Sequence, residues 1–177
     1  RQRGLAGIAL EIVDGGTLEN VTVSNVRIDG VTAAVFLRLG NRARSYVKKA
    51  KKPGVGTFQN VVLRDITAEN TSEVGCSITG LPGHPIQGVL LENLKLGFDG
   101  GGARELVSRK VPERADSYPE STMLRFRTGK SVGQRHAQGL VFRNVELRTA
   151  RPDLRHAMVF DDVKRLEIDG LDADCAK

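Results

Sequence analysis

The 177-residue chain contains no tryptophan, and its aromatic side chains are limited to six phenylalanines and two tyrosines. A core therefore has to be built mainly from Val, Ile and Leu, which suits stacked β-strands better than a fold around large aromatic rings. No apolar stretch is long enough to span a bilayer, and the first residues lack the pattern of a secretory signal peptide. We therefore predict no membrane partner, and the compartment stays open.

Cysteine is also scarce, since only Cys76 and Cys175 occur. Neither has the neighbouring ligands that a metal site requires. A disulfide is the less favoured alternative, because nothing in the chain makes the two residues neighbours. We predict two free thiols, no bound metal and no cofactor.

What the chain does contain is a nine-residue phrase that occurs five times. In every copy the second, fourth, seventh and ninth residues are apolar, which gives twenty apolar residues in twenty places. The sixth residue is always Asn, Asp or Gly. The copies are residues 20–28 (NVTVSNVRI), 60–68 (NVVLRDITA), 88–96 (GVLLENLKL), 139–147 (GLVFRNVEL) and 165–173 (RLEIDGLDA).

The spacing of the apolar residues predicts a bend inside each copy. Residues two and four alternate as in a strand with one buried face, as do residues seven and nine, but the step from four to seven is odd. A straight strand would turn the seventh residue outward, so the chain must turn a corner between them. Asn, Asp and Gly enter the left-handed region of backbone space at low cost, which marks the sixth residue as the corner.

A corner that recurs with its apolar residues inside cannot bury them alone, so the copies must stack on one another. We predict an all-β solenoid of about five to six coils, forming a single domain over residues 1–177. Coils of about 26 residues fit the shortest spacing between copies, and the longer spacings predict loops at residues 40–56 and 97–138. A leucine-rich repeat is disfavoured, because the segments between copies resemble strands and loops rather than helices.

A second series of short strands is expected between the copies, at residues 7–13, 34–39, 76–79 and 157–160. If these strands stack in register, Glu11, Arg38 and Thr79 are outward neighbours, about 4.8 Å apart at each step. We expect Glu11 and Arg38 to form an ion pair. This face is either an ordinary exposed sheet or the floor of a binding groove.

The predicted loop at residues 40–56 has six cations and no acidic residue, which equals the net charge of +6 of the whole chain. The cations are Arg42, Arg44, Lys48, Lys49, Lys51 and Lys52. Such a run is either solvated surface or a contact for an anionic polymer. Nucleic acid is not predicted, because Tyr46 is the one interleaved aromatic residue and no nucleic-acid-binding motif accompanies it.

The predicted loop at residues 97–138 is too long for a simple connection. It begins with Asp99 and a run of three glycines, contains the Tyr118-Pro119-Glu120 turn and ends with Arg135 and His136. The glycine run does not precede a helical pattern and lacks the Lys and Ser or Thr of a phosphate loop. Nucleotide binding is therefore not predicted.

Taken in order, several segments resemble the C-terminal half of bacterial polygalacturonase-like proteins, glycoside hydrolase family 28. They are LEIVDGGTLENVTVSN (10–25), FLRLGNRAR (36–44), GLPGHPIQGVLLENLKLGFDGGG (80–102), YPE (118–120), RHAQGLVFRNVEL (135–147) and LRHAMVFDDV (154–163). The resemblance implies a right-handed parallel β-helix that hydrolyses glycosidic bonds of pectin with inversion, using aspartates. It also implies a secreted or periplasmic protein whose N-terminal coils contact this part.

The resemblance places no catalytic residue in this chain. The family's Asn-x-Asp, Asp-Asp and Gly-His-Gly motifs lie in coils that precede the part resembled here. Asp161-Asp162 falls instead at a late structural turn, and Gly83-His84-Pro85 falls in a later loop. An inverting glycosidase needs two carboxyl groups placed across the bond, and this chain offers no convincing pair.

One further departure concerns the substrate. The family grips the substrate carboxylate with an Arg-x-Lys, and the matching positions here are Ala9 and Glu11. This loss favours a neutral or branched sugar, or a carboxylate held instead by Arg38, Arg42 or Arg44.

We therefore expect the C-terminal part of a polygalacturonase-like glycosidase that contributes groove residues for a polysaccharide or oligosaccharide. The expected substrate-binding residues are Glu11, Arg38, Asn41, Arg42, Arg44, Tyr118, Glu120, Arg135 and His136. The alternatives are a non-catalytic polysaccharide-binding solenoid and a structural solenoid.

Overall fold

The computed structural model describes residues 3–72, 75–106, 111–123 and 132–174. The strands are β1 (Gly4–Ile12), β2 (Thr17–Asp29), β3 (Val31–Leu39), β4 (Thr57–Thr71), β5 (Gly75–Thr79), β6 (Ile86–Phe98), β7 (Val132–Thr149) and β8 (Met158–Ala173). One short 3-10 helix, η1 (Arg104–Leu106), is the only helical segment among the described residues.

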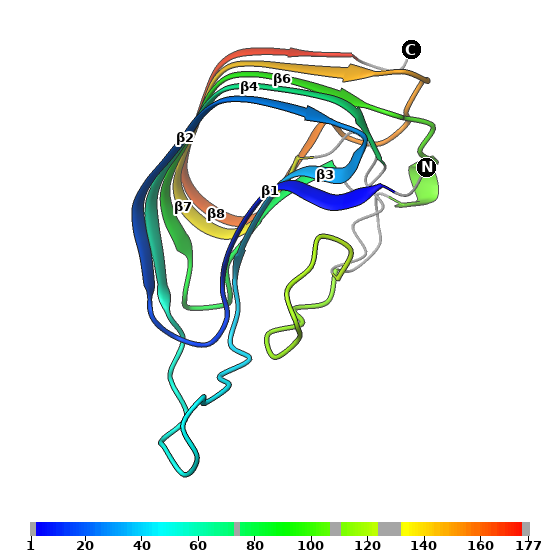
Figure 1. Ribbon diagram of the computed structural model, residues 1–177. Coiled ribbons are helices and arrows are strands. Elements are labelled where there is room, and N and C mark those ends of the chain that lie inside the picture. Colours follow the sequence, from blue (N-terminus) through cyan, green and yellow to red (C-terminus); the bar gives the residue numbers. More distant parts are fainter. Residues whose placement is uncertain (1–2, 73–74, 107–110, 124–131, 175–177) are drawn as a thin grey trace.

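All eight strands belong to one sheet in which every pairing is parallel. The order is β1-β3-β5-β7-β6-β4-β2, and β8 pairs with β7. β7 joins two stacks, because its first residues pair with β5 and its later residues pair with β6. The strands wind around a common apolar interior (Figure 1), so the predicted all-β solenoid of parallel strands is confirmed.

The five copies of the nine-residue phrase lie in register across the sheet. Their second residues pair in a continuous row, Val21, Val61, Val89, Leu140 and Leu166. The sixth residues all have a positive φ, between 50° and 71°, so the predicted left-handed corner is confirmed in every copy. The first residues, with φ between 55° and 69°, form a second left-handed corner that the sequence reasoning missed.

Amide side chains at these corners bond along the solenoid axis. Asn60 Nδ2 donates to Asn20 Oδ1 at 3.3 Å on the first row of corners. On the second row, Asn93 Nδ2 donates to Asp65 Oδ1 at 3.0 Å and Asn144 Nδ2 donates to Asn93 Oδ1 at 2.9 Å. The corner residues therefore supply both the backbone conformation and contacts between neighbouring strands.

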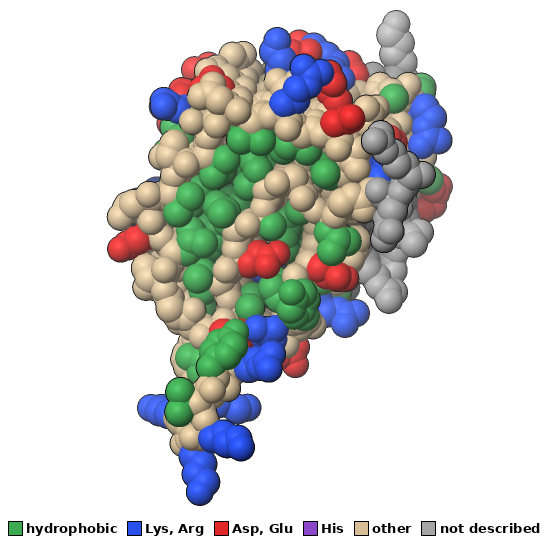
Figure 2. Space-filling view, in the orientation of Figure 1, with side chains coloured by type: hydrophobic (Ala, Val, Ile, Leu, Met, Phe, Trp, Pro, Cys, Tyr) green, Lys and Arg blue, Asp and Glu red, His purple; other side chains and the backbone are tan. Residues whose placement is uncertain are grey.

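Burial of the apolar positions varies along the axis. All twelve such positions in the three middle copies, on β4, β6 and β7, are at most 3% exposed. In the first copy three of the four are half-buried, and in the last copy Leu166, Ile168 and Leu171 are 39–40% exposed. The expectation that all twenty lie inside is therefore wrong for these end positions, because no described strand stacks on β2 or β8 from beyond. Apolar side chains show across the end formed by β1 and β2 (Figure 2).

Two long irregular stretches connect strands, one between β3 and β4 and one between β6 and β7. β3 ends at Leu39 and β4 begins at Thr57, with no regular element between them. The predicted bounds 97–138 are wrong at both ends, because β6 continues to Phe98 and β7 begins at Val132. The sequence at Gln134, Arg135 and His136 lacks the alternation of a strand and was predicted as loop. These residues nevertheless lie in β7, where His136 bends the strand with a φ of 49°.

The glycine run after Asp99 is explained by close packing. Gly102 lies against the buried Arg155, and a Cβ at Gly102 would lie 1.6 Å from Arg155 Nε. Asp153 neutralises this arginine, with Asp153 Oδ2 2.6 Å from Arg155 Nη2. Because glycine has no side chain, the segment that follows β6 can pack closely against the segment between β7 and β8.

Cys76 is a buried free thiol, as predicted, and burial raises its pKa to about 12. Cys175 lies outside the described residues.

Candidate functional site

Residues 111–123, here called the strap, run along the outer side of the stack that contains β1, β3, β5 and the first part of β7. Arg135 Nη1 donates to Val111 O at 2.7 Å, and Asn41 N donates to Ala115 O at 2.6 Å. Ser121 Oγ donates to Leu5 O at 2.6 Å. The strap therefore lies over the face that the sequence predicted as a possible groove floor.

The predicted register of this face is confirmed, since Glu11 pairs with Arg38, Arg38 with Thr79, and Thr79 with Arg135. The predicted ion pair between Glu11 and Arg38 is wrong. Arg38 instead points beneath the strap, and burial raises the pKa of Glu11, for which no partner is found among the described residues.

Arg38 is one of the largest fully buried side chains, only 1% exposed. Its guanidinium donates to three carbonyl oxygens, those of Gly80 at 3.4 Å, Glu113 at 2.7 Å and Arg114 at 3.3 Å. Burial lowers its pKa to about 10, partly offset by Glu113 and reinforced by Arg135. Arg38 is thus a buried cation whose hydrogen bonds within the described chain go to carbonyl oxygens rather than to a carboxylate.

A charged network joins the strap to β7 and β8. Glu113 Oε1 lies 2.5 Å from Arg135 Nη2 and 3.2 Å from His136 Nε2. On its other side, His136 Nδ1 lies 2.7 Å from Asp162 Oδ2, and Asp161 Oδ2 lies 2.8 Å from Arg135 Nε. The hydrogen bond from His136 lowers the pKa of Asp162.

This network includes the aspartate pair. Asp161 and Asp162 lie within β8, where Asp162 has a φ of 51°, a left-handed corner like those of the nine-residue copies. The imidazole of His136 occupies the space between the carboxylates of Glu113 and Asp162. Their present contacts fix the strap onto β7 and β8, since each carboxylate is engaged by a cation or an imidazole.

A second group of charged and aromatic side chains gathers around Asp14, just after β1. Arg42 donates to both carboxylate oxygens of Asp14, with Arg42 Nε 3.0 Å from Asp14 Oδ1. Arg44 N donates to Asp14 Oδ1 at 2.8 Å, and Tyr46 OH donates to Asp14 Oδ2 at 3.2 Å. These bonds, the pair with Arg42 first, hold the pKa of Asp14 well below its usual range.

Both tyrosines of the chain belong to this group. Arg42 Cζ lies 5.4 Å from the centre of the Tyr118 ring, and Arg44 Cζ lies 5.7 Å from the centre of the Tyr46 ring. Tyr118 is 70% exposed and Tyr46 is 78% exposed. We call Asp14, Arg42, Arg44, Tyr46 and Tyr118 the Arg–Tyr cluster, which offers exposed aromatic faces beside guanidinium groups.

The structure thus places the predicted binding residues at different sites. Arg42, Arg44 and Tyr118 come together in the Arg–Tyr cluster, whereas Arg38, Arg135 and His136 lie at or beneath the strap. Asn41 bonds the strap through its backbone, and Glu120 bonds the nearby Thr122. Glu11 lies outside all these contacts among the described residues.

Two members of the cluster, Asp14 and Tyr46, were not among the binding residues predicted from the sequence. Asp14 appears only as part of a turn, and its role depends on a loop about thirty residues further on. The rarity of tyrosine in this chain was the available signal. The lysines of the first loop, residues 48, 49, 51 and 52, are exposed, and basic side chains gather at this projecting end in Figure 2.

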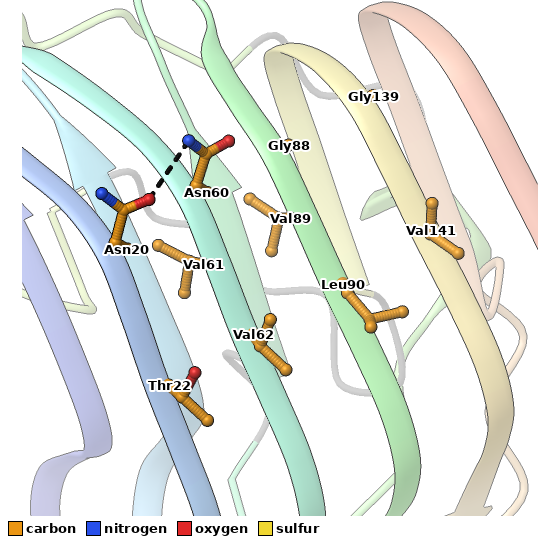
Figure 3. A pocket seen from close by; sticks show the side chains of 10 residues that line it. All are labelled: Asn20, Thr22, Asn60, Val61, Val62, Gly88, Val89, Leu90, Gly139 and Val141. Carbon is orange, nitrogen blue, oxygen red and sulfur yellow. Dashed lines mark hydrogen bonds between the residues drawn. The ribbon is translucent and has the colours of Figure 1, made fainter.

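An open groove of about 470 Å³ runs across the outer side of β2, β4, β6 and β7 (Figure 3). Val62, Leu90 and Val141 line it, and Gly88 and Gly139 leave it without side chains at one rim. Asn20 and Asn60, at the same rim, bond each other. No ionisable side chain of the described residues lines this groove, so it offers less chemistry than the Arg–Tyr cluster.

Comparison with known proteins finds no matching family model, no similar curated protein and no similar solved structure. Within the described ranges, no group of three or more His, Cys, Asp or Glu side chains is arranged to hold a metal ion. No helix in the part of the chain that the structure describes has the length and apolar character needed to cross a membrane.

Proposed function

We propose that this chain is a segment of a right-handed parallel β-helix of the polygalacturonase type that binds acidic, pectin-type oligosaccharide at the Arg–Tyr cluster. One observation carries the proposal. The two tyrosines, which come from separate irregular stretches of the chain, are exposed beside arginines that converge on Asp14. Sugar rings stack on such exposed aromatic faces, and guanidinium groups bind carboxylates.

The charge around the cluster supports an anionic ligand. Arg44 contacts Asp14 through its backbone N–H, so its guanidinium stays available beside Tyr46. The exposed lysines of the same loop add positive charge that attracts an acidic polymer over a longer range. A uronate held here would replace the cationic grip that Ala9 and Glu11 lack in the family resemblance.

In this proposal catalysis belongs to coils that precede this segment, as the resemblance implies, and those coils cover the apolar end formed by β1 and β2. A second candidate is a non-catalytic polysaccharide-binding solenoid. The engagement of Glu113, Asp161 and Asp162 by Arg135 and His136 favours it. The two candidates differ in whether the complete protein releases reducing ends from homogalacturonan.

Variants of the cluster test the proposal. Tyr118→Ala and Arg44→Glu are each expected to weaken binding of trigalacturonate by about tenfold. The first removes an aromatic ring on which a sugar stacks, and the second removes a guanidinium group that binds a carboxylate. The effect of Arg44→Glu is expected to shrink as salt is added, since exposed charges are screened. Isothermal titration calorimetry at low and moderate salt measures both effects.

Lys51→Gln is the matched control, since it removes an exposed charge of the same loop that has no place in the cluster. Its affinity is expected to fall clearly less than that of Arg44→Glu, since one exposed lysine contributes only a small part of the long-range attraction. Equal affinities for wild type, Tyr118→Ala and Arg44→Glu would leave the cluster as ordinary surface and contradict the proposal.

A further inference from the structure

Within the described part of the chain, the buried guanidinium of Arg38 donates its hydrogen bonds to carbonyl oxygens alone. A buried cation is usually neutralised by a carboxylate, because the desolvation of an unpaired charge is costly. Arg38 Nε has no hydrogen-bond partner among the described residues, although Arg38 is only 1% exposed. The site therefore presents an unused donor on a positive charge that no carboxylate of the described residues bonds directly, although Glu113 offsets it in part from a distance.

A second donor with no partner lies on the same outward face. Ser77 is 3% exposed, and no atom of the described residues bonds its Oγ. Ser77 pairs with Phe36 and Thr79 pairs with Arg38, so Ser77 lies on the same outward face as Arg38. Two buried polar side chains that lack full partners among the described residues therefore share one face, and the strap crosses this face at Arg38.

The covering segment supplies the nearest acceptors to Arg38. The carbonyls of Glu113 and Arg114 belong to the strap, at 2.7 Å and 3.3 Å from Arg38 Nη2. They occupy the position from which an anionic oxygen would bind the guanidinium. A carboxylate there would neutralise the charge, which carbonyl oxygens do not.

Polar contacts hold this part of the strap in place. The carboxylate of Glu113 lies 2.5 Å from Arg135 Nη2 and 3.2 Å from His136 Nε2, and Arg135 also bonds Val111 O. The strap continues directly to the Arg–Tyr cluster, since Tyr118 belongs to it and lies beneath Arg42. The Glu113 contacts thus form a latch at one end of a segment whose other part forms the ligand site.

We propose that Arg38 is a further carboxylate-binding residue, covered by the strap and reached by an acidic oligosaccharide when the Glu113 latch opens. This inference rests on the function proposed above, because it extends the same ligand from the Arg–Tyr cluster to Arg38. The sugar carboxylate replaces the carbonyls of Glu113 and Arg114 as the partner of the guanidinium, and hydroxyl groups of the sugar bond Ser77. The position of the strap then determines whether the oligosaccharide binds Arg38 in addition to the Arg–Tyr cluster.

Glu113→Gln tests the latch, because it removes the charge that binds Arg135 and His136 while keeping the backbone carbonyl. Glu120→Gln is the matched control on the same strap, since Glu120 bonds only Thr122 among the contacts described. Hydrogen exchange of the strap amides, measured without ligand, is expected to become faster in Glu113→Gln and to stay unchanged in Glu120→Gln. Unchanged exchange in both variants would overturn the latch.

Titration with trigalacturonate then tests the subsite. Glu113→Gln is expected to bind several-fold more tightly than wild type, and the double variant Glu113→Gln/Arg38→Gln is expected to lose this gain. A second double variant, Glu113→Gln/Arg38→Lys, keeps the positive charge at residue 38 and is expected to retain part of the gain. Thermal unfolding of both double variants checks that each is folded.

The outcomes separate the two proposals. Faster exchange with no gain in affinity would overturn the Arg38 subsite, while the function proposed for the Arg–Tyr cluster would stand if Tyr118→Ala still weakens binding. Equal affinity in wild type and Tyr118→Ala would overturn the function itself, whatever the strap does.

Discussion

Asp153→Ala is expected to lower the free energy of unfolding by about 3–5 kcal/mol, because it leaves the buried charge of Arg155 without its carboxylate. The side chains of the pair are 0% and 2% exposed. Asp153 Oδ1 accepts from Arg155 Nε at 2.8 Å and from Arg155 N at 3.0 Å. Asp153 Oδ2 accepts from Arg155 Nη2 at 2.6 Å and from Gly102 N at 3.1 Å, so the substitution removes four hydrogen bonds.

The direction of the pKa shift agrees with this role. Burial disfavours the charged form of Asp153, but the hydrogen bonds from Arg155 and Gly102 outweigh burial and lower the pKa. Since the folded-state pKa is depressed, the contribution of Asp153 is present at neutral pH and is lost as the pH falls through that pKa. Urea denaturation at pH 7 measures the effect.

Asp172→Ala is the control for this prediction, because Asp172 also pairs with an arginine but is 71% exposed. Its loss is expected to destabilise the fold far less than Asp153→Ala, because water already screens this exposed pair. Equal destabilisation by the two substitutions would show that burial of the Asp153–Arg155 pair does not set its strength.

Leu94→Ala is expected to lower the free energy of unfolding by about 2–5 kcal/mol. Leu94 is 0% exposed and lies at the seventh position of the middle copy of the phrase, between Ile66 and Val145. The substitution leaves a cavity that the rows on both sides cannot fill without distortion, since they are fixed by the sheet pairing. Chemical denaturation midpoints measure the loss.

Leu171→Ala is the matched comparison, because Leu171 holds the seventh position of the last copy and is 39% exposed. It is expected to cost clearly less than Leu94→Ala, since part of its surface is already in water. A loss as large as that of Leu94→Ala would contradict the burial gradient along the solenoid axis.

The repeat could be predicted because it is written in local sequence. Apolar spacing within nine residues gives the buried face, and Asn25 or Gly170 at the sixth position gives the corner, so no distant contact is needed. The corner at the first position was equally local and was missed, although Asn20 and Gly88 carry the same signal. The boundary of β7 was missed because His136 interrupts the alternation that marks a strand.

The partners within the site could not be read in the same way. Arg42 and Tyr118 are 76 positions apart in the chain and meet because the strap crosses from one side of the stack to the other. Arg38 was paired with its nearest opposite charge, Glu11, since sheet register was the information at hand. In the structure Arg38 bonds backbone carbonyls of the strap instead of Glu11, and backbone carbonyls carry no sequence signature.

We propose above that the Arg–Tyr cluster binds a uronate through its charge as well as its rings. Calorimetric titration of the wild-type chain, at low salt, with trigalacturonate and with the fully methyl-esterified trimer separates these two contributions. We expect the acid to bind at least about tenfold more tightly than the ester, because esterification removes the carboxylates that the guanidinium groups bind. Equal affinity for the two trimers, or no binding of either, would contradict the proposal.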